Sequence, residues 1–451
     1  MTLHPPGHIL VLGAGVAGLT AALHLADAGQ RPVLLEAAKA AGGRARSWFD
    51  PACDEELDNG PHLLMGAYTH TLQLLDRLGT RGLLLEEKTP RFTFWDPALG
   101  WQSLRCPEWP APWHLLHALF RFAPLSRPDC WRVMRLLPDL LRQAEHLEQQ
   151  SVTQWLARHG QGGEICQRLW YPLCLATLNE PAASANAALF VRVLQRLFLS
   201  DRAAARPLLP RRPLSHLFAN PARQAILAAG GEVRCQCRVQ HLEWSGRTLQ
   251  ALHSSQGVWP RPRAVVIALP HTALARLLPA WAAERQITAL HSAPIVSVHL
   301  RYPCAATLPV ALLGLPLAAS QWILDRNRLL PLEEQDPRAP GRFSAVLSGA
   351  YRECHWSAQH LIDSVHQDLT RLLPALASVR PAAARVVKEP RATFAAWPGC
   401  ARYRPGSQTP WENVWLAGDW TATGLPATLE GACQSGREAA QKILDLLARA
   451  Q

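Results

Sequence analysis

The segment from His8 to Arg46 constrains the fold of this chain more than any other segment. Its parts, in order, are an apolar run at 9–12, the glycines Gly13, Gly15 and Gly18, a helical pattern of Leu and Ala over 19–28, a second apolar run at 32–35, and Glu36. Both apolar runs are short and uninterrupted, as expected for strands covered on both faces. This order of strand, glycine turn, helix, strand and acid predicts a Rossmann-like dinucleotide site.

The glycine turn and the acid have distinct roles in such a site. Glycines in G-x-G-x-x-G spacing let backbone amides approach a pyrophosphate at a helix N-terminus, where the helix dipole favours an anion. Glu36 follows Gly18 at close to the ~20-residue spacing of the acid that accepts ribose hydroxyls. The contacts predicted in this segment are Gly13, Gly15, Ala17, Gly18 and Glu36.

Three further motifs indicate which dinucleotide is bound. GGR at 42–44 places an arginine where it can reach the same pyrophosphate, VWLAGD at 414–419 reads as another buried strand, and TLEGACQSG follows at 428–436. Together with the glycine turn, these motifs resemble the FAD-dependent amine oxidase and carotenoid desaturase superfamily. The resemblance implies noncovalently bound FAD. Cys400 lies roughly where some amine oxidases attach flavin through a thioether, so covalent attachment is the alternative.

The same resemblance implies further cofactor contacts. They are Gly43 and Arg44 beside the pyrophosphate, Gly60 beside the isoalloxazine, Val239 beside the adenine, Gly418 and Asp419 beside the ribitol, and Leu429 beside the pyrimidine. The implied fold is α/β, an amine oxidase-like flavoprotein in which a Rossmann-like FAD-binding domain is interleaved with an α+β substrate-binding domain. We expect the FAD domain at 1–80, 206–275 and 386–451, and the substrate domain at 81–205 and 276–385.

Charge and cysteine content narrow the class of partner. A formal net charge of +11 is typical of proteins that bind nucleic acid or anionic membranes, but no nucleic-acid-binding motif accompanies it. The 11 cysteines contain no C-x-x-C pair, which indicates reduced thiols in a cytoplasmic protein. A metal pair at Cys235 and Cys237 is the alternative. We expect no nucleic-acid partner and no metal cofactor.

The segment 108–145 combines aromatic residues with arginines. The aromatic residues are Trp109, Trp113, Phe120, Phe122 and Trp131, and the arginines are Arg121, Arg127, Arg132, Arg135 and Arg142. This combination is typical of a segment that lies in a membrane interface. Alternatively, the aromatic residues fill the core or line the substrate cavity. With membrane contact, the expected location is the inner face of the cytoplasmic membrane.

Four longer motifs resemble a narrower family, the hydroxysqualene dehydroxylases. They are LDNGPHLLMGAY at 57–68, LWYPLCLATLNEP at 169–181, QWILDR at 321–326 and LAGDWTATGLPATLEGACQSG at 416–436. The resemblance implies reductive removal of the hydroxyl of hydroxysqualene, a polyisoprenoid, to give squalene for hopanoid synthesis. An allylic alcohol ionises when an acid protonates the leaving oxygen in a site that excludes water.

Three residues are candidates for that acid, because their motifs lie near the flavin in the superfamily. They are His62, Asp58 and Glu430. His62 is preferred, since an imidazolium donates a proton near neutral pH without a large pKa shift. Each residue also has a structural alternative: a packed turn residue for His62, a helix cap for Asp58, and a helix-start acid for Glu430.

Other activities remain open. A phytoene-type desaturase or isomerase would use the same fold on another polyisoprenoid. An amine oxidase would hold a lysine near the flavin in the strand expected at 295–300, where a rough pairing places Val296. A flavin-binding scaffold without turnover is the alternative outside enzymes.

Overall fold

The two apolar runs around the glycine turn form neighbouring strands, β1 (Ile9–Leu12) and β2 (Pro32–Leu35). In this computed structural model, which describes residues 2–87 and 89–449, every residue of both strands is buried. They belong to a parallel sheet of order β10-β2-β1-β14-β20, completed by β10 (Glu232–Arg234), β14 (Ala264–Ile267) and β20 (Val414–Leu416). Burial on both faces explains why the runs do not alternate with polar residues.

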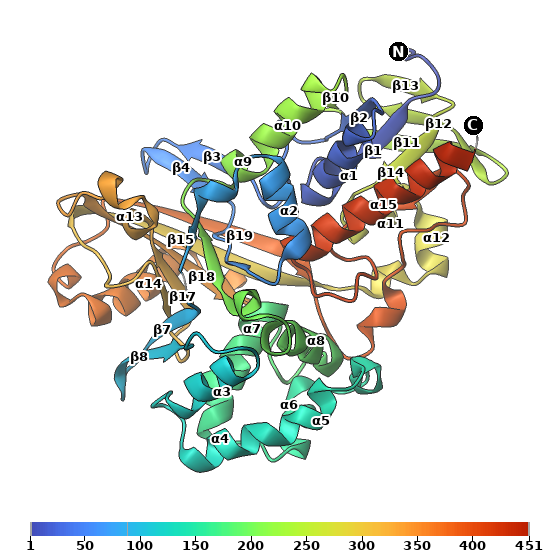
Figure 1. Cartoon of the computed structure of the whole chain (residues 1–451). Coiled ribbons are helices and arrows are strands. Elements are labelled where there is room, and N and C mark those ends of the chain that lie inside the picture. Colours follow the sequence, from blue (N-terminus) through green and yellow to red (C-terminus); the bar gives the residue numbers. More distant parts are fainter. Residues whose placement is uncertain (1, 88, 450–451) are drawn as a thin grey trace.

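Alternate residues of β1 face two different cores. Ile9 and Val11 pack with helices, whereas Leu10 and Leu12 pack on the side of a small antiparallel sheet. The helices are α1 (Val16–Asp27), α2 (Thr69–Arg77), α10 (Ala219–Ala228) and α15 (Leu429–Arg449), and the small sheet contains β11 (Val239–Ser245), β12 (Thr248–Ser254) and β13 (Gly257–Pro260). Helices α1 and α15 lie side by side over the parallel sheet (Figure 1).

The second large sheet is mixed and has seven strands. Its order is β19 (Ala383–Phe394), β15 (Ser292–Ala305), β18 (Pro340–Ser348), β17 (Trp322–Asp325), β16 (Leu312–Gly314), β7 (Arg91–Asp96) and β8 (Gly100–Arg105). Helix α14 (Ala358–Leu372) covers one face, where Val296 and Val298 pack with Leu361 and Val365. The opposite face is therefore the one available to a site between the two sheets.

A group of helices lies below the second sheet, at the bottom of the view in Figure 1. These helices are α3 (Trp113–Phe120), α4 (Arg127–Val133), α5 (Leu137–Leu140), α6 (Val152–Arg158), α7 (Tyr171–Leu178) and α8 (Ala187–Phe198). Ser151 and Gln154 form a capping box at the start of α6, and the Asn186 side chain caps α8. Trp155 and Phe190 are fully buried between these helices. The group thus has its own well-packed interior.

A hairpin connects two halves of the molecule: the half with the parallel sheet and the half with the seven-stranded sheet. It consists of β3 (Ser47–Asp50) and β4 (Glu55–Asp58), and arginines of the second half hold it. Arg326 lies 2.7 Å from Glu55, and Arg385 lies 2.5 Å from Asp50. Arg301 donates to the carbonyl oxygen of Cys53. Because the hairpin leads directly into 59–62, these ion pairs fix where that turn lies.

The smaller elements complete the connections between these units. They are β5 (Leu64–Met65), β6 (Leu84–Glu86), β9 (Pro207–Pro210), α9 (Leu214–Leu217), α11 (His271–Leu277), α12 (Pro279–Glu284) and α13 (Arg326–Leu329). The architecture confirms the predicted fold class, an α/β flavoprotein fold with a Rossmann-like half. The boundary drawn between 385 and 386 divides β19, which belongs to the second sheet as far as Phe394. Among residues 2–87 and 89–449, no helix is both long and apolar enough to cross a bilayer.

Candidate active site

The glycine turn between β1 and α1, Gly13 to Gly18, forms a concave backbone surface that we call the Gly15 cradle. Gly13 has φ +96°, and a Cβ on Gly18 would lie 1.9 Å from the carbonyl oxygen of Gly13, so both positions need glycine for the fold. Gly15 is different: it is the N-cap of α1, and a Cβ there would meet nothing within 4 Å. Since packing does not require glycine at this position, the space beside it fits an approaching ligand, and the helix N-terminus favours an anion there.

Glu36 lies beside this cradle at the end of β2. Its carboxylate accepts hydrogen bonds from the backbone amides of Ala14 and Ala38, both at 2.8 Å. Ala17, also predicted as a contact, packs against α15, where a Cβ on Gly436 would lie 2.2 Å from its carbonyl oxygen. The structure thus brings Glu36 to the glycine turn.

Arg44 and Asp419, predicted to bind the pyrophosphate and the adjoining ribitol, form an ion pair of 2.7 Å. Asp419 is buried, and Arg44 also donates to the carbonyl oxygen of Ala392 in β19. Burial lowers the pKa of Arg44, but the Asp419 carboxylate outweighs this effect, so the pKa is raised overall. Gly43, with φ +57°, lies against Gly15: a Cβ on Gly43 would be 3.0 Å from the Cα of Gly15. The predicted pyrophosphate and ribitol contacts therefore meet in one place.

The turn after β4 lies against the second sheet. A Cβ on Gly60 would be 3.3 Å from Oγ of Ser297, a residue of β15. Nδ1 of His62 lies 2.7 Å from the carbonyl oxygen of Gly60, so the neutral ring donates from that nitrogen. Burial, and then the nearby charge of Arg44, lower the pKa of His62. With a pKa below its ordinary value, the imidazole is mainly neutral at pH 7.

Asp58 is the last residue of β4, and its carboxyl group is hydrogen-bonded. Its Oδ1 accepts hydrogen bonds from Oγ of Ser47 at 2.6 Å and from the backbone amide of Leu214 at 2.8 Å. Burial raises the pKa of this carboxyl group to about 6. Ser47 belongs to the hairpin itself and Leu214 begins α9, so the geometry favours a role for Asp58 in anchoring the hairpin to α9.

Glu430 ties two helices together. Its carboxylate is 1% exposed and accepts hydrogen bonds from Oγ1 of Thr69, the amide of His70, and both the amide and Oγ1 of Thr71. These donors form the first turn of α2, where a carboxylate is stabilised by the helix dipole. With four donors bound, the geometry favours a structural clamp over a proton donor. Leu429, the adjacent predicted contact, begins α15.

Three other residues considered from the sequence also have defined positions. Val239 begins β11 and packs, half-buried, against the core. Cys400 is fully buried, and burial raises the pKa of its thiol to about 12, which disfavours a thioether at this position. Val296 faces α14, whereas Ser297 is the β15 residue that faces the Gly60 turn. Neither residue is a lysine.

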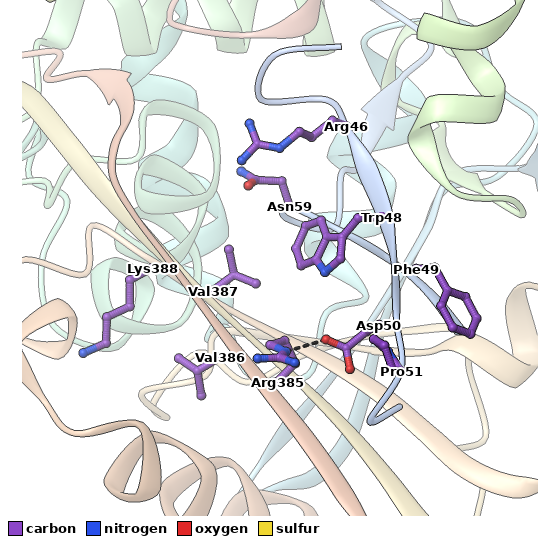
Figure 2. Close-up of a pocket in the computed structure, with 10 residues that line it drawn as sticks. All are labelled: Arg46, Trp48, Phe49, Asp50, Pro51, Asn59, Arg385, Val386, Val387 and Lys388. Atoms are coloured by element: carbon purple, nitrogen blue, oxygen red, sulfur yellow. Dashed lines mark hydrogen bonds and ion pairs between the residues drawn. The ribbon is translucent and has the colours of Figure 1, made fainter. Parts of the chain in front are cut away.

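An open groove lies beside this turn, between β3 and β19 (Figure 2). Its volume is about 640 Å³, and Asn59, one residue before Gly60, lines it. Figure 2 shows Trp48 and Val387 facing each other across the middle, while Lys388 points away. The ion pair between Arg385 and Asp50 closes one end. The groove gives the turn an accessible flank with a partly apolar lining.

The sequence analysis missed two residues of this region. Ser297 was hidden because strand alternation gives two faces without saying which one meets the site. Arg404 lies in WPGCARYRPG, a motif considered only for its cysteine, and its buried guanidinium contacts the segment after Asp419. The signal that could have found it is an arginine among apolar and turn residues, which needs acceptors if it is buried.

The aromatic residues and arginines of the predicted membrane segment are mostly exposed. Four of its five aromatic side chains reach solvent, with Trp113 60% and Trp131 67% exposed, while Phe122 is in the core. All five arginines named above for this segment are exposed. We call the four side chains Trp109, Trp113, Phe120 and Trp131 the α3–α4 surface. The reading of these four as core residues is wrong, whereas it is right for Phe122.

The class of protein follows from this arrangement and from comparison with known families. The model of the family described as flavin-containing amine oxidoreductase matches residues 16–444, and the chain belongs to that family. It is therefore a flavin-dependent oxidoreductase. Cyclohexylamine oxidase from Brevibacterium oxydans IH-35A has the same fold, with a TM-score of 0.73 and 18% identity over 98% of this chain and all of that chain.

Within the family, the chain is similar to hydroxysqualene dehydroxylases. The hydroxysqualene dehydroxylase of Rhodopseudomonas palustris is 32% identical, with 96% of this chain and 97% of the relative covered. The 15-cis-phytoene desaturase of an Oncidium hybrid cultivar is 27% identical, with 97% of this chain and 78% of the relative covered. Both relatives are named for polyisoprenoids, so the narrower resemblance seen in the sequence is confirmed.

Proposed function

We propose that this protein reduces hydroxysqualene to squalene, in squalene and hopanoid biosynthesis, with FAD as a noncovalent cofactor. In this reaction the C–O bond breaks, the oxygen takes up a proton and leaves as water, and hydride forms the new C–H bond. Reduced FAD supplies that hydride when bound. The observation that carries the proposal is the meeting of Arg44, Asp419 and the Gly15 cradle in a relative of hydroxysqualene dehydroxylases.

The protein's own residues then bind and orient the reactants. The amides at the start of α1 and the Arg44 guanidinium would hold the pyrophosphate, and Glu36 would accept ribose hydroxyls. Asp419 would bind the ribitol, with Gly418 beside it, and the start of α15 at Leu429 would face the pyrimidine. Glu36 and Asp419 are already fixed by the hydrogen bond from Ala14 and the ion pair with Arg44.

His62 is the proton donor in this proposal. Its Nδ1–H is held by the carbonyl of Gly60, which leaves Nε2 as the atom that takes up and delivers a proton. The lowered pKa makes its imidazolium a stronger acid, present in a smaller fraction at pH 7. Asp58 and Glu430 hold structural hydrogen bonds instead, which is why His62 is preferred to both.

The alternatives differ in what the same site would do. A phytoene-type desaturase would oxidise its substrate, and the similarity to a phytoene desaturase keeps this activity as the second candidate. Amine oxidation is disfavoured because Ser297 stands where β15 faces the Gly60 turn. Lys388 of β19 does not take the place of such a lysine, because its ammonium group donates to the carbonyl oxygen of Trp356, beside α14.

The test is anaerobic incubation of the chemically reduced holoenzyme with hydroxysqualene, followed by analysis of the extracted lipid. The expected product is squalene, formed in amounts that match the reduced flavin consumed. Phytoene is offered to the oxidised enzyme in parallel. Desaturation of phytoene without squalene formation would replace the proposal with the second candidate. If hydroxysqualene does not oxidise the reduced flavin, and phytoene does not reduce the oxidised flavin, the result would support a binding scaffold without turnover.

The α3–α4 surface is proposed to contact an anionic membrane at the inner face of the cytoplasmic membrane. Its exposed Trp and Phe side chains suit the interface between headgroups and acyl chains, and the neighbouring arginines suit anionic headgroups. Phe120 and Trp131 pack edge to face with ring centroids 5.3 Å apart, which joins α3 and α4 into one surface. A long isoprenoid substrate is stored in such a membrane, so this contact would bring the protein to its substrate.

A further inference from the structure

Arg404 is a buried cation with no ion-pair partner among the residues that the structure describes. It follows the short helix Cys400–Tyr403 and is 5% exposed. Among the residues that the structure describes, no carboxylate oxygen lies within 4.0 Å of its guanidinium nitrogens. An unpaired charge in the interior is costly unless hydrogen bonds stabilise it. Its hydrogen-bond partners therefore indicate what Arg404 is for.

All of those partners belong to one segment, 419–425. Nε donates to the carbonyl of Trp420 at 3.1 Å, and Nη2 donates to the carbonyls of Thr421 at 2.6 Å and Leu425 at 2.8 Å. Longer contacts of 3.4 Å reach the carbonyl of Asp419 and Oγ1 of Thr423. One side chain thus binds five oxygens of a segment that has neither helix nor strand.

The opposite side of the guanidinium is closed by an aromatic ring. Cζ of Arg404 lies 4.4 Å from the ring centroid of Phe394, the last residue of β19. A planar guanidinium stacks on such a ring and keeps its fork of donors in one plane, which an ammonium cannot do. Arg404 is consequently fixed from two directions: by the end of the second sheet and by the segment that it binds.

The segment 419–425 joins two predicted cofactor contacts. It begins at Asp419, whose carboxylate pairs with Arg44, and Leu429 starts α15 four residues after its end. The Asp419 side chain accepts from Arg44 while the Asp419 main chain accepts from Arg404. Any change at Arg404 would therefore reach the carboxylate expected at the ribitol.

We propose that Arg404 is a positioning residue for the flavin: it holds 419–425 in the shape that receives the cofactor, and its buried positive charge favours the reduced flavin. The proposal rests on the proposed function, because it requires FAD at Asp419. The electrostatic part follows from Coulomb attraction in a poorly screened interior, since reduction adds negative charge to the cofactor. Burial lowers the pKa of Arg404 to about 10, so the guanidinium is charged at pH 7.

The test separates shape from charge with two variants. Arg404→Lys keeps the charge but cannot bind five oxygens, so we expect FAD to bind about tenfold or more weakly, with a reduction potential near that of the wild type. Arg404→Met loses both, so we expect weaker FAD binding and a more negative potential. Arg402→Met is the matched control, because exposed Arg402 donates only to the hydroxyl of its neighbour Tyr403. Its FAD affinity and potential should equal those of the wild type.

FAD affinity is measured by fluorescence quenching on reconstitution of the apoprotein, the potential by dye-coupled reduction, and folding by circular dichroism. Wild-type affinity and potential in both Arg404 variants would overturn the proposal. Failure of both variants to fold even with saturating FAD would also overturn it, by making Arg404 a core residue. A wild-type protein that binds no FAD would instead reject the proposed cofactor, which distinguishes the two failures.

Discussion

The lowered pKa of His62 has two opposing effects on acid catalysis: it strengthens the acid and reduces the protonated fraction. Its ring is held by the carbonyl of Gly60, which fixes one nitrogen, while burial and Arg44 lower its pKa. The proton-donating form is therefore strong as an acid but scarce at neutral pH. The rate of the chemical step should rise as pH falls from 8 toward this lowered pKa.

We predict that His62→Ala retains flavin but oxidises it ~100- to 10,000-fold more slowly when hydroxysqualene is added, because general acids typically contribute this factor. Stopped-flow absorbance of the reduced enzyme under anaerobic conditions measures the rate at several pH values. His216→Ala is the control, since His216 is an exposed partner of Glu56. An unchanged rate and pH profile in His62→Ala would exclude His62 and direct attention to Asp58.

Asp58 predicts a pH-dependent stability. The pKa of its carboxyl group is raised by burial to about 6 in the folded protein, above the value of about 4 in an unfolded chain. Between these values the folded state binds more protons than the unfolded state, so the free energy of unfolding falls as pH rises. Between pH 5 and pH 8, the titration of this one group should lower the free energy of unfolding by about 1.4 kcal/mol.

Asp58→Asn keeps an oxygen that can accept from Ser47 and Leu214 but cannot ionise. Its stability relative to the wild type should therefore increase by about 1.4 kcal/mol between pH 5 and pH 8 in urea unfolding. Asp54→Asn on the same hairpin is the control, because the Asp54 side chain is 75% exposed and Asn tolerates its positive φ. Equal pH dependence in wild type and Asp58→Asn would disprove the assignment.

At the scale of elements, the face of a strand or helix on which a residue lies determines its role more than its position along the element does. On β15, Val296 belongs to the core with α14, whereas its neighbour Ser297 faces the Gly60 turn, so a shift of one residue exchanges the two faces. At the end of α3 the same question separates exposed Phe120 from buried Phe122, which follows that helix. Sequence composition identifies the aromatic residues, whereas neighbouring elements determine which of them reach solvent.

The α3–α4 surface predicts salt-sensitive membrane binding. Replacing Trp113, Phe120 and Trp131 together by Ser should weaken binding to vesicles with anionic lipid by about tenfold or more, because the exposed anchors are lost. Binding of the wild type should also weaken as salt rises, since the arginine–headgroup attraction is screened. Co-sedimentation with vesicles measures both effects.

Two exposed apolar residues elsewhere provide the control for that experiment. Phe49, 56% exposed, and Leu332, 83% exposed, lie outside the α3–α4 surface. Replacing both by Ser should leave vesicle binding intact. If the triple variant folds and binds as the wild type does, another surface contacts the membrane.

At the scale of the molecule, the sequence predicted the nucleotide-binding half well because its signals are local. The turn at Gly13–Gly18 and Glu36 lie in one continuous strand–helix–strand unit, and α15 is where its motif places it. The candidate acid could not be predicted in this way. Whether a carboxylate is free or bound depends on donors from distant segments, as Glu430 shows with the first turn of α2. The end of β19 was missed for a similar reason, because its partner β15 lies far back in the chain.

A chain that ends at residue 412 lacks β20 and α15, and with them the pairing to β14 and the packing on α1. We predict that it carries no flavin and loses the parallel sheet, because Asp419 is absent and one face of α1 is uncovered. Visible absorbance and circular dichroism of the purified chain measure both losses. A chain ending at 448 is the control and should keep flavin. Wild-type flavin content in the shorter chain would contradict the prediction.

The ion pair between Arg44 and Asp419 also has a consequence for how the protein is made. Its partners are separated by 375 residues. At ~5 to 20 residues per second, the ribosome needs roughly 20 to 75 s to deliver the second partner after the first. Until β20 and α15 are made, β14 lacks the partner on one edge and α1 lacks the packing of α15, so the nascent chain presents apolar surface of the kind that chaperones bind. Cofactor loading must therefore be one of the last events in the biogenesis of this protein.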